Sequence, residues 1–301
     1  MTSNPNALGA LYMTAAMLGF TLNDAAMKLV TGTVPLFQAV FLRGLLTTVL
    51  LVAVVWMLGG LRFSIPRGDQ SRVAWRTLFE IGAMVTFLTA LIHMPIANAT
   101  AILAALPLAV TLGATLFLKE PLGWRRITAI LVGAVGVLMI VQPGMAGFNI
   151  YALWALAAVA MVTGRDLVTR RFSPAVPSMG VAVITAFGVA VAGGLLSIGE
   201  DWVIPDARAL MLVAFAAVML IGAYVFSVLA MRVGEVGAVA PFRYTSLLFA
   251  LVVGWLVFSE WPNDIALAGA ALVMATGTYT LARERMIRHR AARRAAGQWF
   301  S

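Results

Sequence analysis

The chain contains a repeated segment in which a short turn joins two hydrophobic stretches. Residues 116–142 read LFLKEPLGWRRITAILVGAVGVLMIVQ, and residues 256–282 read LVFSEWPNDIALAGAALVMATGTYTLA. Glu120 aligns with Glu260, and a proline follows each glutamate within two residues. The residues before the turn correspond as well. One half of the chain is therefore a diverged copy of the other, which restricts the fold to architectures built from two similar units.

Composition fixes the class of protein to which the two units belong. Of the 301 residues, 62% are hydrophobic and 11% are charged, with a mean hydropathy of +0.96. Soluble domains are about half apolar and about one quarter charged. Apolar runs of about 20 residues, the length that a helix needs to cross the hydrocarbon core of a bilayer, recur along the chain. The sequence therefore predicts an all-α membrane protein.

Ten membrane spans are predicted, five in each copy. This gives a first repeat at 1–145, a second repeat at 146–285 and a basic tail at 286–301. Because five is an odd number, the second copy enters the membrane inverted relative to the first. Inverted repeats around a central cavity are typical of secondary transporters, which bind substrate near the bilayer midplane. The expected spans are 8–29, 34–58, 73–93, 97–118, 124–142, 149–169, 178–198, 208–230, 237–258 and 265–283.

Loop charges predict the orientation of these spans. Arginine and lysine gather in the loops after the second, fourth, sixth and eighth spans and in the tail. The opposite loops offer only Lys28 and Arg208, beside several acidic residues. By the positive-inside rule, both termini are cytoplasmic in a bacterial inner membrane. The tail is expected to act as an orientation signal that also touches anionic lipid.

The chain resembles the EamA family of the drug/metabolite transporter superfamily over residues 8–284. The resemblance rests on the two helix ends at Glu120 and Glu260 and on the glycines of the helices that follow. It also rests on residues 23–28, on Arg43 and on residues 94–100, which read MPIANAT. It implies ten helices, a central cavity and alternating access. Members of that family export amino acids and drugs, or import metabolites such as riboflavin and S-adenosylmethionine, so the resemblance names no substrate.

Some charged residues within the spans occur in both copies. Asp24 and Asp166 match at the spacing of the repeat, and each has a basic residue four positions later, Lys28 and Arg170. Residues at i and i+4 lie on one helix face, so each pair is expected to neutralise itself. Alternatively, the two pairs are symmetric gates that break and reform. Glu120 and Glu260 are expected to favour the N-terminus of the helix that follows each of them.

Other charged residues within the spans occur in one copy only. Arg43, Arg243 and Glu80 have no charged counterpart in the other copy. Either neighbouring groups hold them, as Arg76 one turn earlier could hold Glu80, or they face the cavity. Facing the cavity, they suit an anionic or zwitterionic substrate, because guanidinium groups bind carboxylates through two parallel hydrogen bonds.

The stretch around Arg243 is the preferred part of the predicted substrate site. Pro241 removes a helix hydrogen bond and frees a carbonyl, and Tyr244 could meet a polar group there. The other predicted substrate-binding residues are Asn98, Trp154, Tyr224 and Phe242, although aromatic residues in membrane helices mostly pack or anchor at the interface. His93 is a candidate for ion coupling, with a solvated helix end as the alternative.

Enzymatic chemistry finds no support in the sequence. The chain has no cysteine and two histidines, which makes the usual zinc sites improbable. It also lacks the motifs of zinc proteases, serine hydrolases and nucleotide-binding loops. We therefore expect no catalytic residue, no metal, no cofactor and no nucleic-acid partner, and transport driven by an ion gradient or by the gradient of the substrate.

The sequence thus predicts a secondary active transporter for a small polar or zwitterionic organic metabolite, with export of an amino-acid-like compound favoured. One alternative is uptake of a larger metabolite, such as riboflavin or a nucleoside-like compound. An alternative of another class is a membrane scaffold that transports nothing. Arg43 and Arg243 speak against it, because a scaffold gains nothing obvious from buried arginines. The expected partners are the substrate and membrane lipid, and the expected state is a monomer or weak dimer.

Overall fold

The computed structural model describes residues 5–57, 64–120, 123–145 and 147–297, and all regular secondary structure within them is helical. The elements are α1 (Pro5–Val30), α2 (Leu36–Met57), α3 (Arg67–His93), α4 (Ile96–Leu103), α5 (Leu106–Leu118), α6 (Trp124–Val141), α7 (Tyr151–Thr169), α8 (Ser178–Leu196), η1 (Ser197–Gly199), α9 (Ala207–Val233), α10 (Val236–Val239), η2 (Ala240–Tyr244), α11 (Thr245–Phe258) and α12 (Asp264–Gly297).

Each of the ten predicted spans corresponds to helical structure, but the fourth and the ninth are broken. The fourth consists of α4 and α5, with Pro107 in the first turn of α5. The ninth consists of α10, the 3₁₀ segment η2 and α11, and Pro241 lies in η2. Proline supplies no backbone N–H and therefore cannot continue an α-helix without a break or kink.

Nine helical stretches in the described part of the chain are long and apolar enough to cross a membrane. The remaining predicted span, α1, is not among them. At 26 residues it is about 39 Å long, which is sufficient length, but it carries Asn23, Asp24 and Lys28 near its end. These polar residues face neighbouring helices, as the site geometry below shows.

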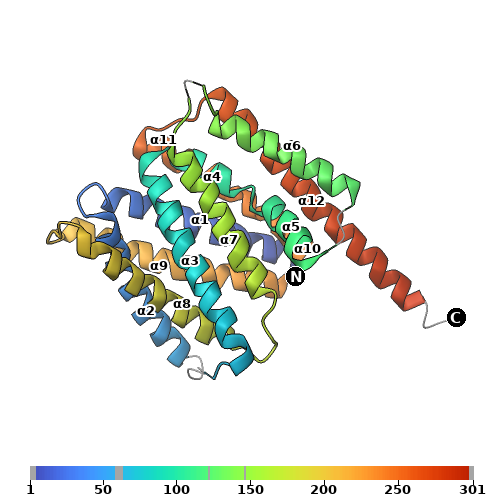
Figure 1. Cartoon of the computed structure of the whole chain (residues 1–301), viewed down its shortest axis with the longest axis horizontal. Helices are drawn as coiled ribbons and strands as arrows, with labels where there is room; N and C mark the ends of the chain where they lie inside the picture. Colours follow the sequence, from blue (N-terminus) through green and yellow to red (C-terminus); the bar gives the residue numbers. More distant parts are fainter. Residues whose placement is uncertain (1–4, 58–63, 121–122, 146, 298–301) are drawn as a thin grey trace.

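The principal helix contacts join the two halves of the sequence. α1 packs along α9, α3 along α7, α2 along α8, and α6 along α12. Figure 1 shows α6 and α12 side by side, with α12 extending beyond the other helices. The ranges 1–145 and 146–285 are therefore not two separately packed bodies.

Small residues bring these helix pairs close together. A Cβ at Gly136 of α6 would lie 2.8 Å from the carbonyl oxygen of Gly269 in α12. A Cβ at Gly44 of α2 would lie 2.8 Å from the Cα of Ala190 in α8. In a membrane, where lipid is as apolar as leucine, close packing of this kind is a main source of helix association.

The repeated turn has the same geometry in both copies. Lys119 and Ser259, one residue before the repeated glutamates, have φ angles of 57° and 54°. The N–H of Glu120 donates to the carbonyl of Ala114, and that of Glu260 donates to the carbonyl of Gly254. The repeated sequence therefore forms the same helix ending twice.

The predicted tail at 286–301 continues α12 as helix to Gly297. The side chains of its arginines lie outside the described residues, so the expected contact with lipid stays a prediction.

Candidate functional site

A chain of polar contacts links α1 and α2 inside the helix bundle. The Arg43 guanidinium, which is 7% exposed, donates through Nη1 to Asn23 Oδ1 at 3.0 Å. Asn23 in turn donates to Asp24 Oδ1 at 2.9 Å, and Asp24 interacts electrostatically with Arg43. The Arg43 Nε has no hydrogen-bond partner in the described part of the chain. One buried donor of this arginine therefore stays available.

A second cluster links α3 and α7. Arg165 donates through Nη1 to Glu80 Oε2 at 3.0 Å, and its Nη2 lies 2.8 Å from Asp166 Oδ1. Arg76, one turn before Glu80, donates to Thr185 Oγ1 of α8. The expected Arg76–Glu80 pair does not form, because Arg165 reaches Glu80 from the neighbouring helix.

Tyr224 connects these two clusters, and Arg243 adds to the second of them. The Tyr224 ring of α9 interacts electrostatically with Glu80, Arg165 and Arg76, and also with Arg43 of the first cluster. Yet Tyr224 is 48% exposed. Arg243, in the break of the ninth span, is also exposed and interacts with Asp166 and Arg165. Both side chains are therefore exposed and at the same time flanked by charged groups from several helices.

The site formed in this way, which we call the central cluster, has an excess of positive charge. It consists of four arginines and three carboxylates: Arg43, Arg76, Arg165, Arg243, Asp24, Glu80 and Asp166. Charged groups within membrane spans are costly and mark substrate or ion pathways. The 3₁₀ backbone at Arg243 agrees with this, since non-helical backbone at membrane depth occurs where it is buried in protein or lines a cavity.

The two predicted pairs along single helices are wrong. Lys28 does not pair with Asp24, and Arg170 does not pair with Asp166. Lys28 instead contacts a carboxylate of the other half of the chain. Asp24 accepts a hydrogen bond from Asn23, and Asp166 forms an ion pair with Arg165. Ion pairs between neighbouring helices form in place of the predicted pairs at i and i+4 on one helix, because these helices pack closely.

Lys28 belongs to a compact ion pair at the end of the molecule that the loop charges predict to be periplasmic. Its Nζ lies 2.7 Å from Glu260 Oε1 and 3.0 Å from Oε2, and it donates to the Met94 carbonyl at 2.8 Å. Glu260 also accepts the N–H of Ile96 at 3.1 Å. Glu260 thus caps α4, and not the following helix α12 as the sequence predicted.

Arg170 and Glu120 form the corresponding pair at the opposite end. They align with Lys28 and Glu260 in the repeat, but their charged atoms are 3.6 Å apart and the side chains are about half exposed, at 50% and 48%. We call the two contacts the Lys28 pair and the Arg170 pair. Each joins a residue of one half to a residue of the other, and the first is much tighter than the second.

Among the remaining predicted residues, Tyr244 interacts electrostatically with Arg243 of the central cluster. His93 is exposed and stacks on Tyr151, with ring centroids 3.8 Å apart. Tyr244 is buried, and its hydroxyl lies against Gly277 of α12. Phe242 and Trp154 are exposed and Asn98 is partly exposed, and within the described ranges none of them has a hydrogen bond or ion pair with the charged groups.

The sequence of the chain matches one protein family twice. The sequence profile of the EamA-like transporter family covers residues 7–142 and again residues 149–281. The chain belongs to the EamA-like transporter family. This confirms the resemblance inferred from the helix ends and motifs, and it makes the protein a multi-pass membrane transporter rather than an enzyme.

Relatives of this EamA-like transporter carry several substrate names. It is 26% identical to the pseudopaline exporter CntI of Pseudomonas aeruginosa over 269 residues, which cover 88% of this chain and 93% of the relative. It is 23% identical to an S-adenosylmethionine uptake transporter of Rickettsia felis, covering 86% and 87%. It is 25% identical to a riboflavin transporter of Rhizobium johnstonii, covering 92% of both.

A solved crystal structure has the same fold as this EamA-like chain. The two superpose with a TM-score of 0.65 over 94% of this chain and 98% of the other, at 21% identity. At this identity the likeness describes the fold and leaves the substrate of the EamA-like chain open.

Sequence reasoning missed Arg165 of the central cluster in this EamA-like transporter, and also Asn23, which links two members of that cluster. Arg165 holds both Glu80 and Asp166, and Asn23 joins Arg43 to Asp24. A signal for Arg165 was present, because it is a second charged residue beside Asp166 inside a predicted span. Asn23 lies in the motif that supported the family resemblance.

Proposed function

We propose that the protein is a secondary active transporter that moves a small polar or zwitterionic organic metabolite across the bacterial inner membrane by alternating access. The substrate binds at the central cluster, and export of an amino-acid-like compound is the favoured direction. This direction agrees with the exporter among the relatives, which covers nearly the whole chain.

The observation that carries the proposal is the exposure of Arg243 and Tyr224 among charges that are otherwise paired. Arg43, Arg76 and Arg165 each have a hydrogen-bond partner. Among the described residues, the Arg243 guanidinium has electrostatic neighbours but no hydrogen-bond partner. Arginine binds carboxylates in a fixed fork geometry. A substrate carboxylate at Arg243, with its cationic group toward Asp166 or Glu80, would match the arrangement of charges.

The two ion pairs between the halves provide a mechanism for alternating access. The Lys28 pair is compact, which supports closure at the predicted periplasmic end in this structure. The Arg170 pair is loose and exposed, which supports an opening at the predicted cytoplasmic end. If the two halves are inverted repeats, the outward-open state is obtained by exchanging the two ends. The Arg170 pair then tightens while the Lys28 pair separates.

Uptake of a larger aromatic metabolite is the second candidate function. It is favoured by the exposed ring of Tyr224, which packs edge-on against Phe20 with centroids 5.3 Å apart and could stack on a flavin or purine. The riboflavin and S-adenosylmethionine transporters among the relatives agree with it.

Thermal unfolding of the purified protein with a panel of compounds tests the proposal. A ligand that binds the folded state at 100 times its Kd stabilises that state by about 2.7 kcal/mol. Amino acids, riboflavin, S-adenosylmethionine and organic cations form the arms of the panel. We expect stabilisation by a compound that carries a carboxylate, and uptake of that compound into vesicles or proteoliposomes.

The matched variants are Arg243→Ala and Arg232→Ala. Both arginines are exposed, but Arg232 lies at the end of α9, away from the central cluster. We expect Arg243→Ala to abolish ligand stabilisation and transport while the protein still accumulates in the membrane. Normal transport by Arg243→Ala would remove this residue from the site. Stabilisation by riboflavin alone would favour the second candidate, and a response to cations alone would turn attention to Asp24 and Glu80.

A further inference from the structure

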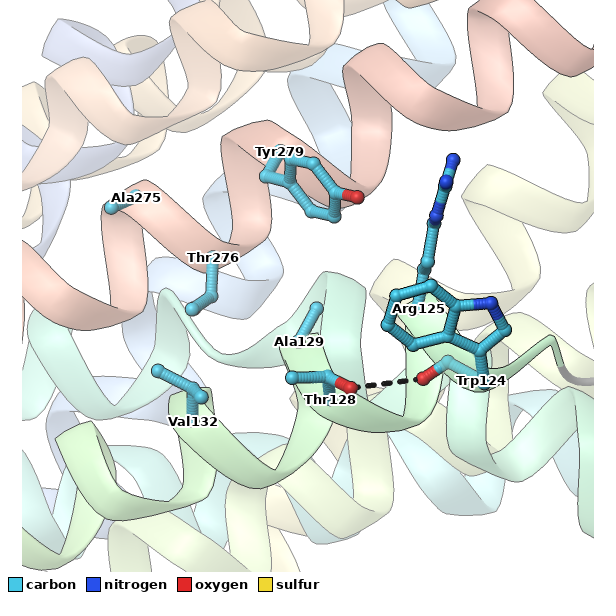
Figure 2. A pocket seen from close by; sticks show the side chains of 8 residues that line it. All are labelled: Trp124, Arg125, Thr128, Ala129, Val132, Ala275, Thr276 and Tyr279. Carbon is cyan, nitrogen blue, oxygen red and sulfur yellow. Dashed lines mark hydrogen bonds between the residues drawn. The ribbon is translucent and has the colours of Figure 1, made fainter.

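A groove of about 330 Å³ lies between α6 and α12, away from the central cluster. Figure 2 shows the side chains that line it, with α12 above and α6 below. Its walls are almost entirely apolar along one part, where Ala129 and Val132 of α6 face Ala275 of α12. Such a surface offers a chain of methylene groups the same environment as the bilayer.

The polar groups of the groove gather at its other end. Arg125 lies over the ring of Trp124 at 5.2 Å from the centroid, and the Tyr279 hydroxyl points toward the side on which Arg125 lies (Figure 2). Trp124 and Tyr279 are 70% and 46% exposed. Arg125 makes no ion pair within the described chain, so its guanidinium is available to an anion.

The two threonines of the groove do not add to this polar end. Thr128 donates to the Trp124 carbonyl at 3.0 Å, and Thr276 donates to the Leu272 carbonyl at 2.9 Å. Both hydroxyls therefore donate their hydrogen bonds to backbone carbonyls of their own helices. The groove has a single cationic end and an apolar remainder, which is the arrangement of an anionic lipid.

Comparison with the other copy of the repeat shows that the fold does not require this polar end. At the spacing that relates Glu120 to Glu260, Trp124 corresponds to Asp264, Arg125 to Ile265, and Tyr279 to Met139. The opposite end of the same helix pair thus has an acidic residue, Asp264, at the position of Trp124, and an isoleucine, Ile265, at the position of Arg125. At these three positions, the basic and aromatic residues lie at the end predicted to be cytoplasmic.

The difference between the two ends of the helix pair agrees with the difference in lipid composition between the two leaflets of the membrane. The cytoplasmic leaflet carries the anionic lipids that attract basic groups, and basic pockets between transmembrane helices on this side bind acidic headgroups. Tryptophan and tyrosine are enriched at the level of the headgroups. Trp124 and Arg125 are the first two residues of α6, so they lie at this level.

We propose that the groove between α6 and α12 binds one anionic phospholipid of the cytoplasmic leaflet. The phosphate is held by Arg125 and the Tyr279 hydroxyl. One acyl chain lies along Ala129, Val132 and Ala275. The site joins the two halves of the chain through α6 and α12 and is separate from the substrate site.

The test measures thermal unfolding of the full chain in detergent with added phosphatidylglycerol or phosphatidylcholine of identical acyl chains. We expect phosphatidylglycerol to raise the unfolding temperature more than phosphatidylcholine. One basic group near a membrane surface strengthens binding about fivefold, so Arg125→Gln should weaken phosphatidylglycerol binding by about that factor and leave phosphatidylcholine binding unchanged.

Two further variants separate the groove from general attraction to a basic surface. Arg232→Gln removes another exposed arginine of the same predicted side and should retain the preference for phosphatidylglycerol. Ala275→Phe fills the groove without changing charge and should weaken binding of both lipids, with Val132→Phe as the replacement if that variant does not fold.

Three results would overturn the proposal. The first is an unchanged lipid preference in Arg125→Gln. The second is equal loss in Arg125→Gln and Arg232→Gln, which would mean diffuse attraction to the surface. The third is the same stabilisation by inorganic phosphate alone, which would mean an anion site that needs no acyl chain.

Discussion

Arg165 and Arg243 lie in the same cluster but have different surroundings. Arg165 is held by Glu80 on one side and by Asp166 on the other, with its side chain 24% exposed. Arg243 is exposed, and its guanidinium has no hydrogen bond to the part of the chain that the structure describes. Arg165 is therefore expected to matter for the folded state, and Arg243 for the ligand.

Removal of Arg165 should destabilise the protein whether or not substrate is present. Arg165→Ala leaves two carboxylates without their partner, and a charged hydrogen-bond partner is worth about 1.5–3 kcal/mol. Because the group is partly exposed, we expect a loss near the lower limit, about 1–2 kcal/mol. Thermal unfolding without ligand measures this loss.

Arg165→Lys is the control for charge. It keeps the positive charge but loses the fork that reaches two carboxylates at once, so it should recover part of the stability. Unfolding of Arg243→Ala in the same assay should stay near that of the unchanged protein. If Arg243→Ala were the less stable variant, the roles assigned to the two arginines would be reversed.

The sequence analysis identified most of the charged residues within the membrane spans, with the exception of Arg165, but not how they pair. Along one sequence, only pairs on the same helix are visible, and these gave Asp24 with Lys28 and Asp166 with Arg170. The pairs that form join residues 85 and 232 positions apart. Their proximity depends on which helices pack together, and hydrophobic periodicity in strongly apolar helices says little about that.

At the scale of the elements, the repeated turn shows how one local conformation ends two helices. Lys119 and Ser259 both adopt the left-handed conformation, which costs a residue with a side chain roughly 1 kcal/mol relative to glycine. Neither copy uses glycine at this position. The two helices therefore end at a position that is locally unfavourable.

Glycine at these positions should stabilise the protein. Lys119→Gly and Ser259→Gly are each expected to raise the free energy of unfolding by about 0.5–1 kcal/mol, because glycine adopts positive φ without steric cost. Thermal unfolding provides the measurement. Lys119→Ala and Ser259→Ala remove the same side chains without this relief, and an equal rise in the alanine variants would show that the conformation is not the cause.

Element boundaries were predicted less well than the existence of the elements. The length and apolar character of each span located ten helical regions, since a bilayer requires both. The break in the fourth span was not predicted, and α12 runs to Gly297, well past the predicted end at 283. Apolar character marks where a helix leaves the hydrocarbon and does not mark where its hydrogen bonds end.

At the scale of the whole molecule, the helix contacts change the expected motion. The sequence predicted two inverted repeats with alternating access, an architecture in which each repeat is expected to move as a unit. The principal contacts instead run between the halves, so two halves moving as rigid bodies would break all of them. We expect the moving groups to contain helices of both halves, with the Lys28 pair and the Arg170 pair at their opposite ends.

Weakening the two pairs should shift access to the central cluster in opposite directions. The chain has no cysteine, so Tyr224→Cys introduces a single thiol that reports access to that cluster. In this background, Glu260→Gln removes a charge-assisted contact worth about 1.5–3 kcal/mol. It should raise labelling by an impermeant reagent from the periplasm about tenfold or more.

Glu120→Gln is the matched variant at the other end. It weakens the pair that the outward-open state would need, so labelling from the periplasm should fall or stay unchanged. A similar rise in both variants would contradict opposite roles for the two pairs.

The distance along the chain between paired charges also sets the delay between the synthesis of a charged residue and the synthesis of its partner. Glu80 and Lys28 enter the membrane long before their partners, which are synthesised 85 and 232 residues later. At about 5–20 residues per second, the ribosome needs roughly 12–46 s to reach the partner of Lys28. During that time an isolated charge in the bilayer is costly. The first five spans are therefore synthesised before α7, which carries the partner of Glu80, and before the turn after α11, which carries the partner of Lys28.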